Sequence, residues 1–176
     1  VPGSALFPTG GAFFREPADD PDSLGAMLYN LAPGPRDSHA HQEANGISLS
    51  AYGARLLVNG GWLGDTTDPA PANNTLTIGG REHRRYHGAG LQEGLIGPGI
   101  DYAAGDAGPA LGKRHHVRSL VLVHGRPDVP GYAVIIDEVA AEPDDRVHTY
   151  FHPATERDVA VVAEGLHLAA TIDHHV

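Results

Sequence analysis

The stretch Gly46-Ile47-Ser48-Leu49-Ser50-Ala51-Tyr52 alternates apolar and polar residues, and after Gly53 the chain continues as Arg55-Leu56-Leu57-Val58. A period of two places alternate side chains on opposite faces of an extended strand. A glycine between two such runs supplies the turn that joins antiparallel neighbours. This stretch therefore predicts a β-hairpin with one buried face.

Similar runs recur along the chain, whereas helical periodicity does not. We predict further strands at 26–31, 74–78, 100–104, 116–124, 132–139 and 147–152, and a last hairpin from 159–162 and 166–172. About ten short strands separated by turns predict an all-β fold, an antiparallel β-sandwich. Residues 64–72 and 81–99 show neither period and are predicted to be loops.

Length and charge limit the function classes. The 176 residues fit one domain, residues 1–176, and the net charge of −10 disfavours nucleic acid and anionic membranes as partners. No apolar run is long enough to cross a bilayer, and without cysteine there are no disulfides or thiolate metal sites. Protonating all 12 histidines would raise the charge to +2, so histidine titration sets the sign of the molecule.

The densest group of chemically active residues is Ser38-His39-Ala40-His41-Gln42-Glu43, directly before the first hairpin. In an extended segment, His39, His41 and Glu43 point to the same side, where two neighbours can share a metal ion or a substrate atom. Two hydrogen-bonded surface histidines are the simpler interpretation. Cupin metal sites also contain His-x-His followed by Glu, although with a longer spacing than here, so a cupin-like metalloenzyme is an alternative.

The order of the motifs gives a closer comparison. SHAHQEANGISLSAYGARLLVNGGW (38–62) is followed by NNTLTIGG (73–80) and RHHVRSLVLVHGRPDVPGYAVIIDEV (114–139). This succession resembles the β-sandwich domain of the heparinase II/III-like polysaccharide lyases, from about residue 11 to about residue 152. The resemblance implies a lyase-type super-sandwich that acts on a uronic-acid polysaccharide, such as a glycosaminoglycan or alginate, by β-elimination. It also implies a helical toroid as a partner domain that is absent from this chain.

The resemblance assigns roles to individual residues. His39 matches the histidine that faces the substrate cleft in the family, which makes it the candidate catalytic residue. The family's zinc ligands are the second histidine, an acidic residue and a further histidine, and here these positions are His41, Asn59 and Asn73. Because an amide is a poor zinc ligand, only His41, with Glu43 beside it, is left as a candidate for metal. Asn59 and Asn73 are expected to hold the loop together by hydrogen bonds.

Arginine-rich segments are candidates for substrate binding. One seven-residue segment, 81–87, contains Arg81, Arg84, Arg85 and Tyr86, although the chain as a whole is acidic. A loop of this kind can clamp anionic sugars. A solvated charged loop is the alternative. Trp62 is a candidate for stacking on a sugar ring, with a place in the core as the alternative. In the pattern Arg114-His115-His116-Val117-Arg118, His116 and Arg118 share a face, for which structural pairing is the preferred interpretation.

The main rival to a lyase domain is a non-catalytic carbohydrate-binding or structural domain. The sequence leaves the oligomeric state open, a homo-oligomer included. The resemblance favours a periplasmic or secreted protein, while the residues themselves leave the localisation open.

Overall fold

The computed structural model describes residues 3–16, 22–33, 40–61, 66–85 and 87–154, together with the backbone of 159–160 and 169–170. The described residues form thirteen strands and two short 3-10 helices, and none of them is in an α-helix. The strands are β1 (Ala5–Phe7), β2 (Gly11–Arg15), β3 (Gly25–Tyr29), β4 (Gly46–Ala51), β5 (Ala54–Leu57), β6 (Leu76–Ile78), β7 (Gly90–Ile96), β8 (Ile100–Asp106), β9 (His115–Val123), β10 (Tyr132–Ala140), β11 (Val147–Thr149), β12 (Val159–Ala160) and β13 (Ala169–Ala170), and the helices are η2 (Ala70–Ala72) and η3 (Gly108–Leu111). The all-β prediction is confirmed. No helix in the described part has the length and hydropathy that a bilayer crossing requires.

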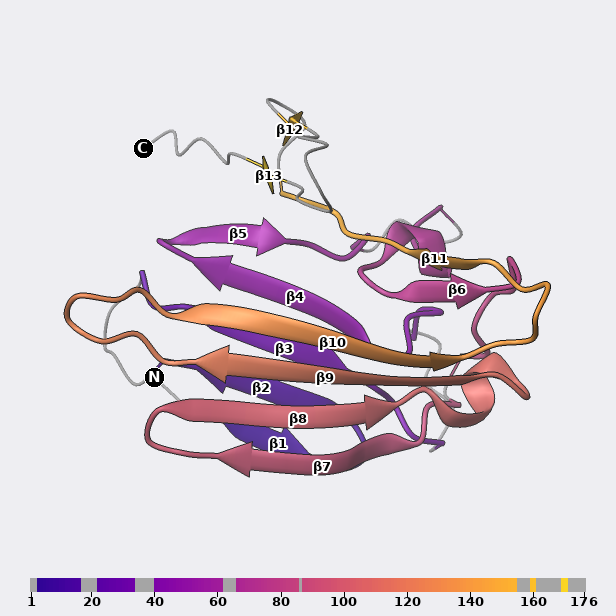
Figure 1. The fold of residues 1–176 in the computed structure, drawn as a ribbon, viewed down its shortest axis with the longest axis horizontal. Coiled ribbons are helices and arrows are strands. Elements are labelled where there is room, and N and C mark those ends of the chain that lie inside the picture. The colour runs from indigo at the N-terminus through magenta and orange to yellow at the C-terminus, as the bar shows by residue number, and fades with distance from the viewer. Residues whose placement is uncertain are drawn as a thin grey trace.

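Two antiparallel sheets lie face to face (Figure 1). One has the order β1-β2-β3-β4-β5 and the other the order β10-β9-β8-β7, while β6 pairs with β11, and β12 with β13. Both large sheets are meanders, because neighbouring strands are consecutive in the chain. Cupin jelly rolls are built from Greek keys instead, so this topology does not match the cupin alternative.

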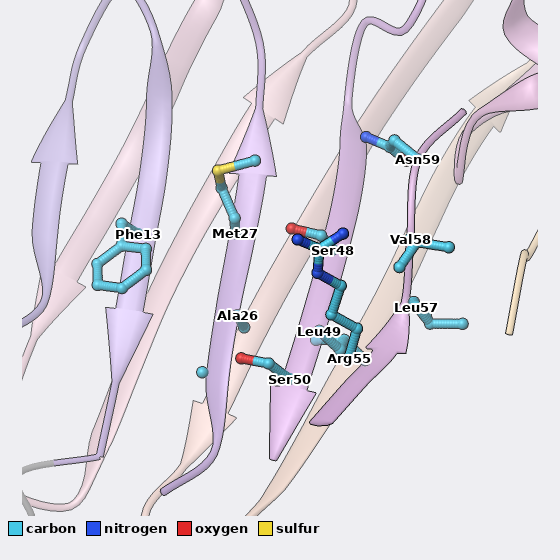
Figure 2. A pocket seen from close by; sticks show the side chains of 11 residues that line it. Phe13, Ala26, Met27, Ser48, Leu49, Ser50, Arg55, Leu57, Val58 and Asn59 are labelled. Carbon is cyan, nitrogen blue, oxygen red and sulfur yellow. The ribbon is translucent and has the colours of Figure 1, made fainter. Parts of the chain in front are cut away.

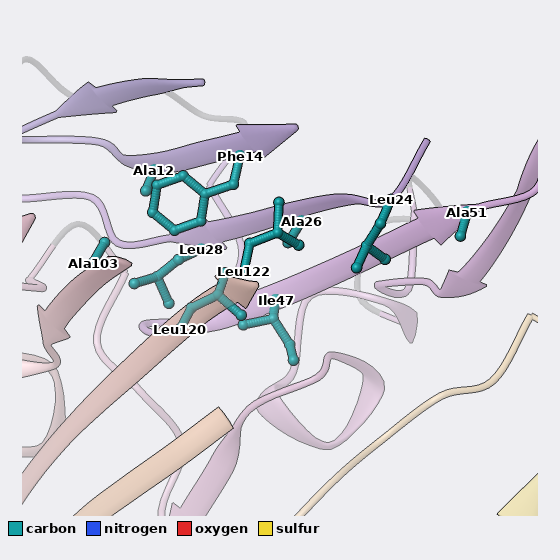
Figure 3. Packing of buried hydrophobic residues seen from close by; sticks show 10 residues of the cluster. All are labelled: Ala12, Phe14, Leu24, Ala26, Leu28, Ile47, Ala51, Ala103, Leu120 and Leu122. Carbon is teal, nitrogen blue, oxygen red and sulfur yellow. The ribbon is translucent and has the colours of Figure 1, made fainter. Parts of the chain in front are cut away.

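The main core lies between the two large sheets (Figure 3). Its buried members are Ala12, Phe14, Leu24, Ala26, Leu28, Ile47, Ala51, Ala103, Leu120 and Leu122. Four of these ten residues are alanines, so the sheets can approach closely around the larger side chains. A second cluster under β6 contains Leu76, Ile78, Ala107 and Leu111.

The predicted first hairpin forms as β4 and β5. Tyr52 and Gly53 connect them with φ angles of 55° and 69°. Two consecutive left-handed residues are typical of a type I′ turn, whose twist matches that of paired strands. Gly53 adopts this conformation without steric cost, whereas Tyr52 does so at some cost.

Strand β7 lies inside the region 81–99, where the sequence predicted a loop, and that part of the prediction was wrong. The alternation in β7 is interrupted by two glycines, Gly90 and Gly94, and by two consecutive polar residues, Gln92 and Glu93. A bulge between Leu91 and Glu93 also shifts the register. A β-carbon at position 94 would lie 2.7 Å from a methyl group of Leu6. A larger residue here would force the Leu6 side chain to move, so packing against β1 favours glycine, although glycine weakens the strand pattern in the sequence. The short strands β1 and β2 were not predicted either.

One end of the sandwich gathers the loops that contain the candidate residues. Pair β6–β11 and helix η3 lie at this end, on the right in Figure 1, and the turn that joins β9 to β10 lies at the opposite end. The segment before β4, the segment around η2 and the segment after β6 all meet here, joined by backbone hydrogen bonds such as Gln42 N to Asp68 O at 2.8 Å. Among the described residues, His41, Glu43, Arg81, Arg84 and Arg85 lie in segments at this end of the fold.

Candidate functional site

His41 is held between two carboxylates. Its Nδ1 lies 3.8 Å from Glu43 Oε1, and its Nε2 lies 3.5 Å from Asp68 Oδ1. Asp68 comes from the segment before η2, and its other oxygen accepts a hydrogen bond from the guanidinium of Arg85. His41, Asp68 and Arg85 therefore form a chain of polar groups that runs from a largely buried imidazole to a more exposed arginine.

Glu43 is the carboxylate of this group that is furthest from water. Burial, together with the negative charge of Asp68, raises its pKa from 4.5 to about 7. Its Oε2 accepts a hydrogen bond of 2.7 Å from Asn59 Nδ2, which positions the carboxyl group. A carboxyl group with a pKa near neutrality can hold or release a proton under ordinary conditions, which is a common property of functional sites.

Asn59 and Asn73 use both ends of their amides to hold the surrounding backbone. Asn59 Oδ1 accepts hydrogen bonds from the backbone N and from Nδ2 of Asn74, at 2.9 and 3.0 Å. Asn73 Nδ2 donates to the carbonyls of Thr67 and Pro69, and its Oδ1 accepts from Gly60 N at 3.2 Å. The expected structural use of both asparagines is thus present.

These residues do not fit a zinc ion of the family type. Both amide oxygens already accept hydrogen bonds from the backbone. The carboxylates of Glu43 and Asp68 approach different nitrogens of His41, on opposite edges of the ring, whereas a single ion binds only one of them. Among the described residues, no group of three or more His, Asp or Glu is arranged to hold a metal.

A buried polar network supports the loop from below. Arg118 on β9 is fully buried and makes two hydrogen bonds to Asp137 on β10, at 2.7 and 2.9 Å. Its Nη1 donates to the carbonyls of Asn45 and Asn74, so the cation connects β9 to the segments before β4 and β6. His116 Nε2 donates to the same carboxylate at 2.8 Å. The predicted structural pairing of His116 and Arg118 is confirmed, and Asp137 is the partner of both.

Burial and hydrogen bonding together determine the pKa values in this network. Burial alone would raise the pKa of Asp137, but the hydrogen bonds from His116 and Arg118 lower it well below its usual range. Burial lowers the pKa of His116 despite the adjacent carboxylate. The imidazole is therefore neutral, with its proton on Nε2, and Nδ1 faces Asn45 Nδ2 at 3.4 Å. The network stays intact at neutral pH.

The predicted arginine group divides into two parts in the structure. Arg85 points towards Asp68 and His41, whereas Arg81 and Arg84 line a separate cavity with Lys113 and Arg114. His83, between them in the sequence, is not a binding residue, because it is 1 % exposed and its Nε2 donates to Leu76 O at 2.7 Å.

A groove crosses the outer face of the five-stranded sheet and ends at Asn59 (Figure 2). It has a volume of about 370 Å³. Four adjacent strands, β2 to β5, each contribute a side chain to the groove: Phe13, Met27, Ser48 and Arg55. The groove offers one aromatic face, one cation and hydroxyl groups, which are suitable contacts for a sugar.

The other predicted site residues, His39, Trp62 and Tyr86, lie outside the described residues. Sequence reasoning missed Asp68 and Asp137. Asp68 lies in a region without periodicity, so nothing in the sequence connects it to His41. Asp137 could have been found, because pairing the predicted strands 116–124 and 132–139 across the hairpin places it opposite Arg118.

Comparison with solved structures shows which proteins share this fold. A mutant of heparan sulfate lyase HepC from Pedobacter heparinus matches with a TM-score of 0.74 and 16% identity, over 91% of this chain and 26% of that chain. The HepC structure itself matches with a TM-score of 0.65 and 18% identity, over 80% and 22% of the two chains. A heparinase III matches with a TM-score of 0.66 and 18% identity, over 82% and 23%.

The chain therefore spans about a quarter of the length of these lyases and resembles one domain of them. At this level of identity the likeness establishes the fold. No protein-family model matches the sequence, and no curated protein matches it significantly.

Proposed function

We propose that this chain is the β-sandwich domain of a polysaccharide lyase that cleaves an acidic, uronic-acid-containing polysaccharide by β-elimination. The observation that carries the proposal is the fold correspondence with a heparan sulfate lyase over 91% of the chain. The histidine and arginine segments at one end of the sandwich add the residue types that this chemistry needs. The rest of the catalytic site would come from a helical toroid.

The reaction has three requirements that the chain's residues can serve in part. The uronate carboxylate must be neutralised, a base must remove the proton at C5, and the C4 oxygen must receive a proton as its bond to C4 breaks and the C4–C5 double bond forms. His39 would transfer one of these protons, because an imidazole titrates near neutrality. Arg81, Arg84 and Arg85, with Tyr86 and Trp62, would bind the acidic sugars.

His41 and Glu43 would act as positioning residues in this proposal. His41 lies two residues from His39 and is fixed by Asp68 and Glu43. The loop keeps its shape through Asn59 and Asn73, so it has no need of zinc.

The test is lyase activity, followed by the absorbance of the unsaturated uronate product. The full-length parent should cleave heparan sulfate or alginate, whereas this chain alone should not, because half a catalytic site loses most of the rate. His39→Ala in the parent should lower kcat by about 100-fold or more. An unchanged kcat in that variant would exclude His39 from the chemistry, and activity of the 176-residue chain alone would refute the two-part site.

A non-catalytic carbohydrate-binding domain is the second candidate, and the groove beside Phe13 and Arg55 favours it. This function would give saccharide binding by the chain and no unsaturated product from the parent. Arg55→Gln would then weaken binding without any change in product formation.

A further inference from the structure

A basic cavity of about 550 Å³ lies at the β6–β11 end of the sandwich. Arg81 and Arg84 line it from the segment after β6, and Lys113 and Arg114 line it from the turn between η3 and β9. Four of the chain's 12 basic residues thus meet in one cavity, although the chain carries a net charge of −10. Two acidic residues, Glu82 and Glu142, also line it.

Three of the four cations that line this cavity have no direct ion-pair partner among the described residues. Arg114 is neutralised by Asp145 through hydrogen bonds of 2.6 and 2.7 Å. Within the described part of the chain, no carboxylate lies within ion-pair distance of Arg81, Arg84 or Lys113. Arg81 still contributes, after Arg114, to the low pKa of Asp145. Three cations therefore face the cavity without a direct ion-pair partner.

The segment that presents the arginines is firmly anchored. Arg84 N donates to Ala110 O at 2.9 Å, and Glu82 Oε2 accepts a hydrogen bond of 2.9 Å from Ala70 N. His83 is buried between them, and burial lowers its pKa to about 4, so it remains neutral in the interior. A ligand would meet cations on a preformed backbone, which reduces the ordering cost of binding.

Arg84 connects this cavity to the histidine segment. It also lines a small pocket with His41, Ala44 and Gly88. A saccharide whose reacting unit lies near the histidines could therefore place a neighbouring unit over the basic cavity.

We propose that this cavity is a binding subsite for a sulfate or carboxylate group of an acidic saccharide, with Arg81, Arg84 and Lys113 as its ligands. Guanidinium groups bind such oxyanions in bidentate fashion, and Lys113 adds a point charge. The inference rests on the proposed function for the identity of the saccharide, and it adds Lys113, the chain's one lysine, to the residues expected to bind it.

The test is calorimetric titration of this chain at low ionic strength with three probes: a heparin tetrasaccharide, an alginate tetrasaccharide and inorganic sulfate. Arg81→Gln and Lys113→Gln should each raise the Kd of the heparin probe by about threefold to tenfold, and the double variant should raise it further. Binding of alginate by the wild type would assign the subsite to carboxylates, and binding of heparin alone would assign it to sulfates.

The matched control is Arg126→Gln, which removes one exposed positive charge at the opposite end of β9. An equal loss of affinity in the control would show general charge attraction and overturn the subsite. Wild-type affinity in the double variant would overturn it too. As a measurement that needs no variant, the heparin probe should shift the amide NMR signals of Arg84 and Gly112, and unshifted signals on binding would contradict the proposal.

The two proposals fail in different ways. Loss of heparin binding in Arg85→Gln, with normal binding in the double variant, would reject the subsite and leave the lyase function in place. Binding of inorganic sulfate that requires Lys113, without binding of either saccharide, would uphold the anion site and contradict the proposed function. Absence of all binding would reject both.

Discussion

Replacing Glu43 by glutamine should change how the stability of the protein depends on pH. Glutamine keeps an oxygen that can accept the hydrogen bond from Asn59 and removes the titrating carboxyl group. Glu43 has a pKa of about 7 in the folded protein, against an ordinary value of 4.5. The folded state therefore retains a proton that the unfolded chain releases between these two pH values.

The sign and size of the effect follow from this difference. Below pH 4.5 the carboxyl group is mostly protonated in both the folded and the unfolded state, so it does not lower the free energy of unfolding. Between pH 4.5 and 7 the unfolded chain ionises while the buried carboxyl group keeps its proton, so the free energy of unfolding falls by about 1.4 kcal/mol per pH unit, or about 3 kcal/mol in total, and it levels off above pH 7, where both states are ionised. Glu43→Gln should remove this loss, so the variant should be the more stable protein at pH 8.

The measurement is urea denaturation of both proteins at pH values from 4.5 to 8.5, followed by circular dichroism. The informative quantity is the difference in unfolding free energy between variant and wild type, because the titration of the histidines largely cancels in it. Glu138→Gln, an exposed carboxylate on β10, is the control and should give a flat difference. A flat difference for Glu43→Gln as well would show that this carboxylate is hydrated and refute the reasoning.

Two further predictions concern the framework of the site. Arg118→Met leaves the carboxylate of Asp137 without its bidentate partner and should lower the free energy of unfolding by about 3–5 kcal/mol in urea titrations. The control Arg126→Met, at an exposed position, should change it by less than about 0.5 kcal/mol. A loss below about 1 kcal/mol for Arg118→Met would contradict the network's role. Treatment with EDTA should leave the melting temperature unchanged, because Asn59 and Asn73 hold the loop through hydrogen bonds, and stoichiometric zinc in elemental analysis with a large fall in melting temperature on chelation would show the opposite.

The sequence was sufficient to predict the sandwich because its long strands alternate clearly. In β9, buried and half-exposed residues alternate along the whole strand, and even the inward His116 and Arg118 keep the period. Strand β7 escaped prediction because glycine at position 94, where a β-carbon would crowd the side chain of Leu6, interrupts the alternation. The contact joins strands that are distant in the sequence, so no local pattern records it.

The candidate site was only partly predictable, for a similar reason. The grouping of histidines and arginines was visible in the sequence, but their spatial partners were not. Asp68 binds Arg85, whereas Arg81 and Arg84 line a different cavity. The turn after η3 brings Lys113 to that same cavity. Both contacts depend on how loops meet at the end of a sheet, which the alternation of side chains does not encode.

The buried position of Asn45 also affects how the protein ages. An asparagine followed by glycine, as in Asn45-Gly46, is prone to deamidation, because the flexible glycine nitrogen can attack the side-chain amide. Here the Gly46 N–H is bonded to Glu43 O at 2.7 Å, and the Asn45 amide bonds Asn30 through Oδ1 and His116 through Nδ2. Attack would require these bonds to break, so the folded chain protects a residue that the unfolded chain would lose. Deamidation of Asn45 would place a new carboxylate in the interior beside His116. Because the unfolded chain deamidates faster than the folded one, the intact mass of a stored sample would report on its folded fraction.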